Sequence, residues 1–389
     1  MIHVFLGTKA QYIKTAPLLR LLDAQAVPYR LIDSGQHASL SEGLRDELGV
    51  RAPDHRLAEG VDITRIPQAM LWAAKLATRL FNGRKLRAEV FGGERGVCVV
   101  HGDTPSTLLS ALMAKRAGLK VAHLEAGLRS GHLLHPFPEE LIRVVVMRVA
   151  DLLFAPDDDA VANLRRMRLR GQVIRLPGNT IVEALHHELG LRDTADHEAV
   201  VGEAANHEPA AITAEAGQVA ESSEGMGPAV VTMHRVENLN RRERVEQLVA
   251  VVERIATERP VRFVQHGPTI DTLKKRGLLG RLQRAGVELV GLAPHGEFVA
   301  MLAAASFVIT DGGSIQEECA LLGVPTLLWR AATERPDGVG ANVVISRYDG
   351  DIIERFVADP RAHRCAPADT GAAPSELVLE HLQRFRHSG

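Results

Sequence analysis

The sequence predicts an α/β protein built from two doubly wound, Rossmann-like domains whose parallel sheets face each other across a cleft. Short apolar, β-branched runs alternate with helical patterns of spaced apolar residues, and this alternation is typical of parallel sheets. It occurs twice, before residue 184 and again after residue 228. The 389 residues are enough for two domains of ordinary size. We therefore expect one domain over residues 1–183 and a second over residues 229–372.

The segment between these two blocks differs in composition. From about His187 to Pro228 the chain is rich in Ala, Glu, Gly and Ser, and apolar periodicity resumes only at Val230. This composition predicts that residues 184–228 form a hinge that carries a mobile insertion. After the second block, a helical pattern covers Ser375–Arg386, within the terminal stretch 373–389.

Composition excludes several classes of function. A formal charge of −2 gives no reason to expect nucleic acid as a partner. The sequence has no apolar run long enough to span a bilayer, and Ile2–Leu6 is typical of a strand instead of a signal peptide. We therefore expect a cytoplasmic protein without a membrane partner. The three cysteines and 17 histidines show no disulfide or metal-ligand spacing, so we expect neither a metal nor another cofactor.

The most informative stretch runs from Val97 to Arg143, where the pattern predicts strand, helix, strand, long loop and helix. Asp103 and Glu125 each follow a buried strand. Adjacent parallel strands end at the same edge of a sheet, which is where open α/β sheets bind ligands. Glu139 follows Pro138 at a helix start, where the helix dipole favours a carboxylate.

These three acids allow two interpretations. Asp103 could be no more than a helix cap, and Glu139 could be an ordinary charge in a first helical turn. However, three consecutive loops deliver three carboxylates to one edge of a sheet. That arrangement favours acid–base chemistry over capping.

Two further loops could bind an anion. Gly7 permits a tight turn after the first strand, and Lys9 and Lys14 could place positive charge beside a phosphate. Alternatively, they are surface lysines of an ordinary strand–helix unit. In the second block, the residues from Gly312 to Ser314 lie at a predicted helix start, whose free N–H groups suit a diphosphate. Glu317 and Glu318 follow one turn later and could accept ribose hydroxyls.

An ordered set of motifs resembles the UDP-N-acetylglucosamine 2-epimerases over nearly the whole chain. The motifs are HGDT, HLEAGLRSG, PFPEE with Arg143, GNT at Gly178–Thr180, TMHRVEN at Thr232–Asn238 and TDGGSIQEE at Thr310–Glu318. The resemblance implies a fold similar to glycosyltransferase B, a UDP-sugar as substrate and a homodimer. It also implies that the helix in residues 373–389 crosses back to the first domain.

The resemblance implies a set of site residues as well. The catalytic candidates are Asp103, Glu125, Glu139 and His234. The substrate-binding candidates are Lys9, Lys14, Arg143, Asn179, Arg235, His266, Gly313, Ser314 and Glu318. His234 alone could instead be a histidine that caps a strand end.

Two segments depart from the family. Lys9-Ala10-Gln11 stands where Arg-Pro-Glu is usual, and Leu57–Arg65 has no counterpart of the Gln-Pro-Gly-Gln effector segment. Effector regulation therefore stays open.

The chemistry implied by the resemblance starts at C2 of the sugar. No carbonyl activates the C2 proton, so UDP must leave C1 as the C2–H bond breaks, which gives a glycal. Two acids or bases on opposite faces of the ring could then remove and return the proton. Re-addition of UDP gives UDP-N-acetylmannosamine, whereas addition of water gives N-acetylmannosamine and UDP, and the sequence leaves both open. Two other classes of function stay open for this fold: a glycosyltransferase and a non-catalytic nucleotide-sugar sensor.

Overall fold

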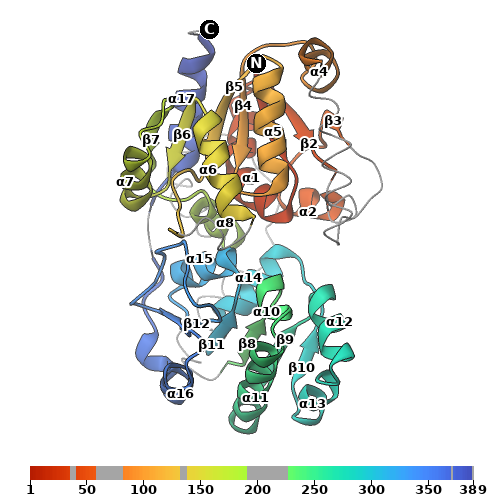
Figure 1. Cartoon of the computed structure of the whole chain (residues 1–389), viewed down its shortest axis with the longest axis vertical. Coiled ribbons are helices and arrows are strands. Elements are labelled where there is room, and N and C mark those ends of the chain that lie inside the picture. Colours follow the sequence, from red (N-terminus) through yellow and green to blue (C-terminus); the bar gives the residue numbers. More distant parts are fainter. Residues whose placement is uncertain (36–40, 58–81, 132–137, 191–226, 369–370, 388–389) are drawn as a thin grey trace, which may run out of the picture. The chain divides into compact units, whose positions relative to one another are not determined.

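Two parallel sheets organise the chain in a computed structural model that describes residues 1–35, 41–57, 82–131, 138–190, 227–368 and 371–387 (Figure 1). The first sheet has seven strands in the order β3-β2-β1-β4-β5-β6-β7. The second has six strands in the order β10-β9-β8-β11-β12-β13. The strand pairs of both sheets are parallel. The predicted fold class, two doubly wound parallel sheets, is confirmed.

The chain divides into two compact units, each built around one sheet. Unit 1 comprises Met1–Ala184 together with Thr370–Gly389, and unit 2 comprises Leu185–Asp369. The described elements of unit 1 are β1 (Ile2–Leu6), α1 (Lys9–Ala24), β2 (Tyr29–Asp33), α2 (Ser41–Glu47), β3 (His55–Arg56), α4 (Gly83–Val90), β4 (Val97–His101), α5 (Pro105–Arg116), β5 (Lys120–Leu124), α6 (Glu139–Val149), β6 (Leu152–Ala155), α7 (Asp158–Arg166), β7 (Gln172–Arg175), the start of α8 (Ile181–Glu188) and α17 (Pro374–His387).

Unit 2 begins within α8 and repeats the alternation of strand and helix. Its further described elements are β8 (Ala229–Thr232), α10 (Val236–Leu239), α11 (Arg242–Glu258), β9 (Val261–Val264), α12 (Gly267–Lys275), α13 (Leu279–Arg284), β10 (Glu288–Val290), α14 (His295–Ala303), β11 (Phe307–Thr310), α15 (Gly313–Leu322), β12 (Thr326–Leu328), β13 (Val343–Ile345), α16 (Gly350–Ala358) and the 3₁₀ turn η2 (Pro360–His363).

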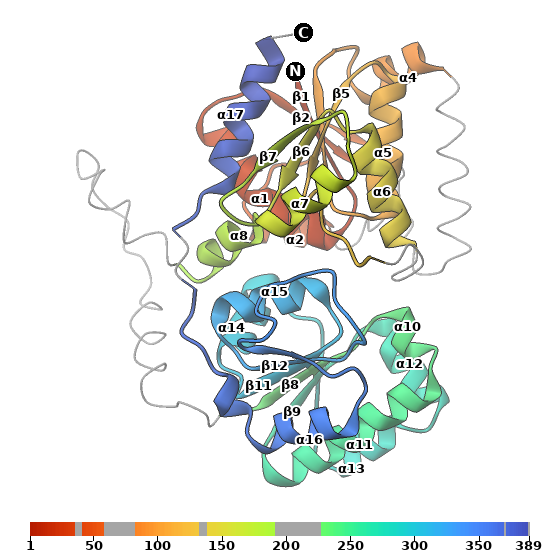
Figure 2. The same ribbon diagram turned by 60° about the vertical axis from the view of Figure 1, so that its left-hand side comes forward.

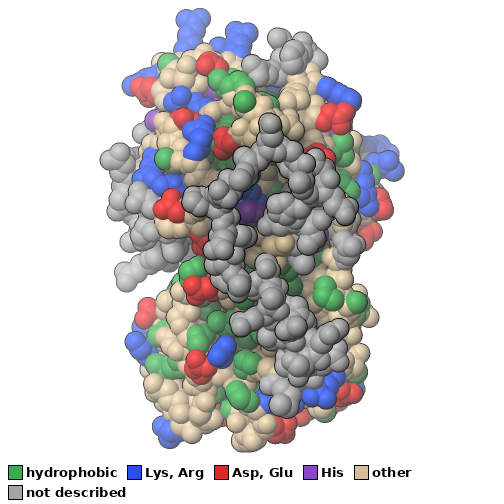
Figure 3. All heavy atoms as spheres, turned by 180° about the vertical axis from the view of Figure 1, so that it is seen from behind, with side chains coloured by type: hydrophobic (Ala, Val, Ile, Leu, Met, Phe, Trp, Pro, Cys, Tyr) green, Lys and Arg blue, Asp and Glu red, His purple; other side chains and the backbone are tan. Residues whose placement is uncertain are grey.

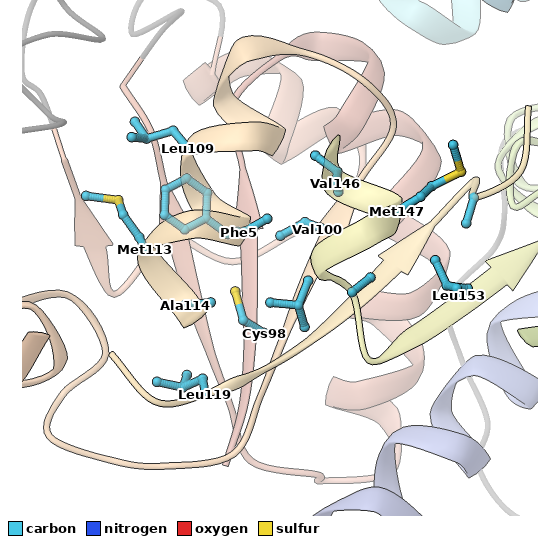
Figure 4. Close-up of a cluster of buried hydrophobic side chains, with 14 of the residues drawn as sticks. Phe5, Cys98, Val100, Leu109, Met113, Ala114, Leu119, Val146, Met147 and Leu153 are labelled. Carbon is cyan, nitrogen blue, oxygen red and sulfur yellow. The ribbon is translucent and has the colours of Figure 1, made fainter. Parts of the chain in front are cut away.

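Helices cover both faces of the unit 1 sheet, with α1 and α17 on one face and α5 and α6 on the other (Figure 2). The central strands are mostly apolar, as expected for strands that are covered on both faces. Figure 4 shows the core beneath α5 and α6, where Phe5, Cys98 and Val100 of the sheet pack against Met113 and Val146. This packing fixes the strand ends that carry the candidate acids.

The terminal helix α17 packs beside α1 within unit 1. Its N-terminus is capped by Glu183 of α8, whose carboxylate accepts hydrogen bonds from the backbone N–H of Ser375, at 3.0 Å, and from its hydroxyl. Ser375 and Glu183 are 1% and 2% exposed. This buried cap ties the start of α8 to the terminal helix.

The strand β10 is short, covering only Glu288–Val290, and it pairs on one side alone, with β9. Residues 191–226, within the predicted hinge and its mobile insertion, lie outside the described residues, as do residues 58–65 of the segment Leu57–Arg65.

Charged side chains of both signs are interspersed on the face of the molecule in Figure 3, which agrees with the small net charge. In the described parts of the chain, no helix is both long and apolar enough to cross a membrane. Cys98 and Cys319 are buried, Cys365 is exposed, and all three are free thiols. Among the described residues, no group of three or more His, Cys, Asp or Glu is arranged to hold a metal ion.

Candidate active site

Several of the predicted site residues follow the two strands at which the strand order of each sheet reverses. In unit 1 this switch lies between β1 and β4, and in unit 2 between β8 and β11. Doubly wound sheets bind ligands outside the carboxyl ends of the strands at this point. Lys9 and Asp103 follow β1 and β4, and His234 and Gly313 follow β8 and β11. Each unit therefore carries its candidates at the position where such a sheet binds a ligand.

Glu125 is held in a buried polar cluster at the end of β5. The Nζ atom of Lys14 lies 2.6 Å from Oε1 of Glu125, and the two side chains are 2% and 5% exposed. Asn179 donates a hydrogen bond of 3.0 Å to the same oxygen, while Nδ1 of His101 lies 3.8 Å from Oε2. Glu125 also adopts a left-handed backbone conformation, with φ of +64°. Such strain in a non-glycine residue is typical of functional sites.

Asp103 belongs to a chain of alternating charges that runs through the buried side chains of Arg143 and Glu140 to Arg129. Arg143 of α6 donates one hydrogen bond to Asp103 and a second, of 2.8 Å, to Glu140. Glu140 is fully buried and also accepts a hydrogen bond from Arg129. The planar guanidinium can hold two carboxylates in fixed directions. Asp103, which is 20% exposed, is therefore oriented by a buried arginine.

Asp103 and Glu125 lie close together because Gly102, the residue directly before Asp103, passes beside the carboxylate of Glu125. Gly102 has φ of +70°, and a Cβ at this position would lie 3.4 Å from Oε2 of Glu125. His123 fixes the same turn, with Nε2 2.7 Å from the carbonyl oxygen of Gly102. Burial lowers the pKa of His123 to about 4, so its ring is neutral at pH 7. Glu125 thus lies beside the residue that precedes Asp103.

Two other candidates of unit 1 lie at helix starts. Glu139 is the first residue of α6, next to Glu140, and is partly exposed. Lys9 is the first residue of α1, is partly exposed, and forms no ion pair with another described residue. The sequence predicts Lys14 beside a phosphate, whereas in the structure its ammonium group contacts the carboxylate of Glu125.

Gln11 joins the loop after β1 to the loop that carries Asp103. Its carbonyl oxygen accepts hydrogen bonds from the N–H groups of Gly7, at 2.7 Å, and Thr8, at 3.1 Å. Its amide nitrogen donates to the carbonyl oxygen of His101, at 2.7 Å, and to the hydroxyl of Thr107, at 2.8 Å. A glutamate in this conformation could accept but not donate. Gln11, which stands where the family usually has glutamate, therefore makes a set of contacts that requires an amide.

In unit 2, Asp311 shapes the loop that carries His234. Asp311 is fully buried directly after β11. Its carboxylate accepts hydrogen bonds of 3.0 Å from the backbone N–H groups of His234 and Arg235 and from the side chain of Asn238. Nδ1 of His234 lies 3.3 Å from Oδ1 of Asp311. His234 is thus oriented by the neighbouring strand, and its ring is 39% exposed.

The loop of His234 lies against the start of α15. A Cβ at Gly312 would come 2.9 Å from Cε1 of His234, so the close approach requires glycine there. The rings of His234 and His266 are 4.9 Å apart between centroids. Arg235 extends from the same loop and pairs with Glu237 at 3.0 Å. These contacts bring three of the predicted residues of unit 2 into one cluster: His234, Arg235 and His266.

The start of α15 presents backbone N–H groups without a side-chain cap. Gly313 and Ser314 are its first two residues, both partly exposed, and the hydroxyl of Ser314 has no hydrogen bond among the described residues. Glu317 is buried and paired with Arg335, whereas Glu318 is hydrogen-bonded to His295 at 2.9 Å. The two adjacent acids are therefore in different environments.

Sequence reasoning missed four residues that hold the candidates in place. Asp311 follows a strand directly, which is the same signal that identified Asp103. Glu140 stands next to Glu139, and only its burial distinguishes the two. Gln11 and His295 belong to no pattern that indicates their contacts, because their partners are distant in sequence.

Comparison with known proteins identifies the class to which this fold and site belong. The architecture is that of a protein with two doubly wound α/β units, similar to glycosyltransferase B, with carboxylates in one unit and an uncapped helix start in the other. The family model of UDP-N-acetylglucosamine 2-epimerase matches residues 20–359. The chain belongs to the UDP-N-acetylglucosamine 2-epimerase family.

Individual relatives are similar over most of their length. A probable UDP-N-acetylglucosamine 2-epimerase of Ralstonia solanacearum is 30% identical over 361 residues, covering 91% of this chain and 88% of the relative. The UDP-N-acetylglucosamine 2-epimerase of Methanocaldococcus jannaschii is 28% identical over 363 residues, covering 92% and 90%. A crystal structure of the Methanocaldococcus jannaschii enzyme with UDP-GlcNAc and UDP superposes with a TM-score of 0.75 at 26% identity, over 98% and 99% of the two chains.

Proposed function

We propose that this protein is a UDP-N-acetylglucosamine 2-epimerase that inverts C2 by eliminating UDP to a glycal and adding it back. The observation that carries this proposal is the adjacency of Asp103 and Glu125, each held by its own buried cation. Two positioned carboxylates are what removal and return of one proton require. The family membership and the relatives named for this activity support the same reaction.

In this proposal the acids of unit 1 act on the sugar. Two of Asp103, Glu125 and Glu139 serve the C2 position: one takes the proton from one face of the ring, and another returns a proton to the opposite face. Arg143 orients Asp103, and Asn179 and Lys14 orient Glu125. The electron pair of the C2–H bond becomes the C1–C2 double bond as the C1–O bond breaks, so the proton and UDP leave together. Reversal from the other face gives UDP-N-acetylmannosamine.

The residues of unit 2 stabilise the departing UDP. The negative charge that develops on the diphosphate favours cationic groups and free N–H donors. The start of α15 at Gly313 and Ser314 supplies such donors, and His234 and Arg235 supply positive or polar side chains beside it. His266 and Lys9 complete the proposed substrate-binding set. Glu318 is assigned to a ribose hydroxyl, since Glu317 is taken by Arg335.

Product analysis tests this function directly. The protein is incubated with UDP-N-acetylglucosamine, and the sugars are separated and identified by NMR. A mixture of the two UDP-sugars supports the epimerase, and free N-acetylmannosamine with UDP identifies the hydrolysing variant. Transfer to an added sugar acceptor, or binding without turnover, contradicts the proposal. A homodimer is part of the proposal, and light scattering should give twice the chain mass of 42.2 kDa.

A further inference from the structure

A buried ion cluster in unit 2 joins three residues that are far apart in the sequence. His295, the first residue of α14, lies between two carboxylates. Its Nε2 is 2.9 Å from Oε1 of Glu318, on α15, and its Nδ1 is 3.6 Å from Oε1 of Glu188, at the end of α8. The side chains of His295, Glu318 and Glu188 are 3%, 4% and 10% exposed. These two carboxylates are the charged groups that the described residues place against the ring.

The cluster carries one cation for two acids. Burial by itself disfavours the charged ring, but the carboxylates of Glu188 and Glu318 outweigh it and raise the pKa of His295 to about 9. The ring is therefore an imidazolium at pH 7. If that cation is removed, two desolvated carboxylates face each other in one site without a positive charge between them.

Glu318 has one oxygen left for a ligand. Oε1 accepts the hydrogen bond from His295. Oε2 is buried and has no hydrogen-bond partner among the described residues. A buried carboxylate oxygen without a donor is costly, so the position favours a ligand that supplies one. Glu318 lies in α15 about one turn after Ser314, where the proposed function puts the nucleotide.

We propose that His295 is a positioning residue whose positive charge and hydrogen bond hold the carboxylate of Glu318, so that Oε2 accepts a hydrogen bond from a ribose hydroxyl of the nucleotide. This inference rests on the proposed function, because it requires a uridine nucleotide at the start of α15. An ionised acceptor makes a stronger hydrogen bond than a neutral one. Without the cation of His295, the carboxylate of Glu318 would be a less firmly held and therefore poorer acceptor, and the site would lose much of its preference for ribose.

The test compares two nucleotides that differ only in the ribose hydroxyls. Calorimetry at pH 7 measures the binding of UDP and of 2′,3′-dideoxyuridine diphosphate. The wild type should bind UDP about tenfold more tightly or better, the usual effect of a hydrogen bond to a charged group. In H295Q this preference should nearly vanish, and in H295K, which retains a cation, it should persist. E188Q is the matched control, because it removes a carboxylate from the same cluster but leaves the pair of His295 and Glu318, so its preference should remain.

The comparison of the two nucleotides separates this role from simple packing. In H295Q, loss of the cation beside Glu318 should weaken UDP more than the dideoxy nucleotide, whereas a packing defect would weaken both nucleotides equally. An unchanged preference in H295Q, or equal losses for both nucleotides, overturns the inference while the proposed function stands. If the wild type binds neither nucleotide, both fail. Should H295Q not fold, H295N is compared with H295K in the same way.

Discussion

The ammonium nitrogen of Lys14 lies 2.6 Å from Oε1 of Glu125, and neither side chain is exposed to solvent by more than 5%. This pair joins the first helix of unit 1 to the candidate acid at the end of β5. A buried charge without its partner is strongly destabilising. The relationship therefore links the stability of unit 1 to its chemistry.

Replacing Lys14 by Met should remove the buried cation that contacts the carboxylate of Glu125. We expect a loss of about 3–5 kcal/mol in the free energy of unfolding, measured by urea denaturation. K85M is the control, since Lys85 pairs with Glu89 at 3.6 Å on the surface, with side chains 68% and 52% exposed. An exposed pair contributes at most about 1 kcal/mol. Equal effects of the two substitutions would contradict a special role for the buried pair.

Restoring the residue usual in the family at position 11 should be harmful here. The amide of Gln11 donates to the carbonyl oxygen of His101, and Q11E would place a carboxylate oxygen against that carbonyl. We expect Q11E to lower the free energy of unfolding by about 1–3 kcal/mol, the cost of leaving buried acceptors without a donor. Thermal unfolding should show a lower midpoint for Q11E. A variant as stable as the wild type would show that the loops rearrange to accommodate the acid.

A methyl group at Gly313 should disturb the proposed diphosphate site. The added Cβ would lie 2.7 Å from Nε of Arg335, which pairs with Glu317. We expect G313A to weaken UDP binding about tenfold, the equivalent of one charged hydrogen bond, measured by calorimetry. G350A is a matched control: Gly350 also begins a helix, α16, and its Cβ would meet nothing within 4 Å. UDP affinity that is unchanged in G313A would argue against this helix start as the site.

The stability of the protein should pass through a maximum because its buried histidines titrate in opposite directions. The pKa of His295 is raised to about 9, so its stabilising contribution is complete below pH 6.5 and is lost as the pH rises through 9. Burial and the nearby positive charges of the N-terminus and Arg30 lower the pKa of His3 to about 3. Its contribution is present above pH 6.5 and is lost as the pH falls.

Urea denaturation across pH 5 to 10 checks this expectation. The wild type should lose up to about 3 kcal/mol between pH 6.5 and 9 from His295, since each pKa unit corresponds to about 1.4 kcal/mol. In H295Q this decline should be absent, while the loss below pH 6.5 persists. The same decline in both proteins would assign it to other groups.

The fold could be predicted because its signals are local. The alternation of apolar strands and amphipathic helices is a property of neighbouring residues, and β1 covers the predicted strand Ile2–Leu6. Asp103 and Glu125 could be placed at one sheet edge because parallel strands end together. The strand pattern therefore predicts the catalytic candidates, although it does not predict the side chains that hold them.

The partners of these residues could not be predicted in the same way. His295 contacts Glu318 across 23 positions, and Lys14 contacts Glu125 across 111. Glu317 is buried and pairs with Arg335, although Glu317 and Glu318 look equivalent in the sequence. Pairing of this kind depends on packing between elements, which no local pattern encodes.

Substitution of the candidate acids should slow the reaction, measured on variants that circular dichroism shows to be folded. We expect D103N, E125Q and E139Q each to reduce turnover of UDP-N-acetylglucosamine by about a hundredfold or more, which is the usual effect of a positioned acid or base. E94Q, which changes an exposed glutamate of unit 1, should leave turnover unchanged. Full activity in any of the three would remove that residue from the catalytic set.

Hydrogen exchange at C2 of the sugar tests the central claim most directly. The wild-type protein is incubated with UDP-N-acetylglucosamine in deuterated water, and the C2 proton signal of the products is followed by NMR. Elimination to a glycal removes this hydrogen and returns a solvent deuteron, so the C2 signal of every product should disappear. Products that retain the C2 hydrogen, or a bound substrate that shows neither exchange nor turnover, would contradict the proposed mechanism.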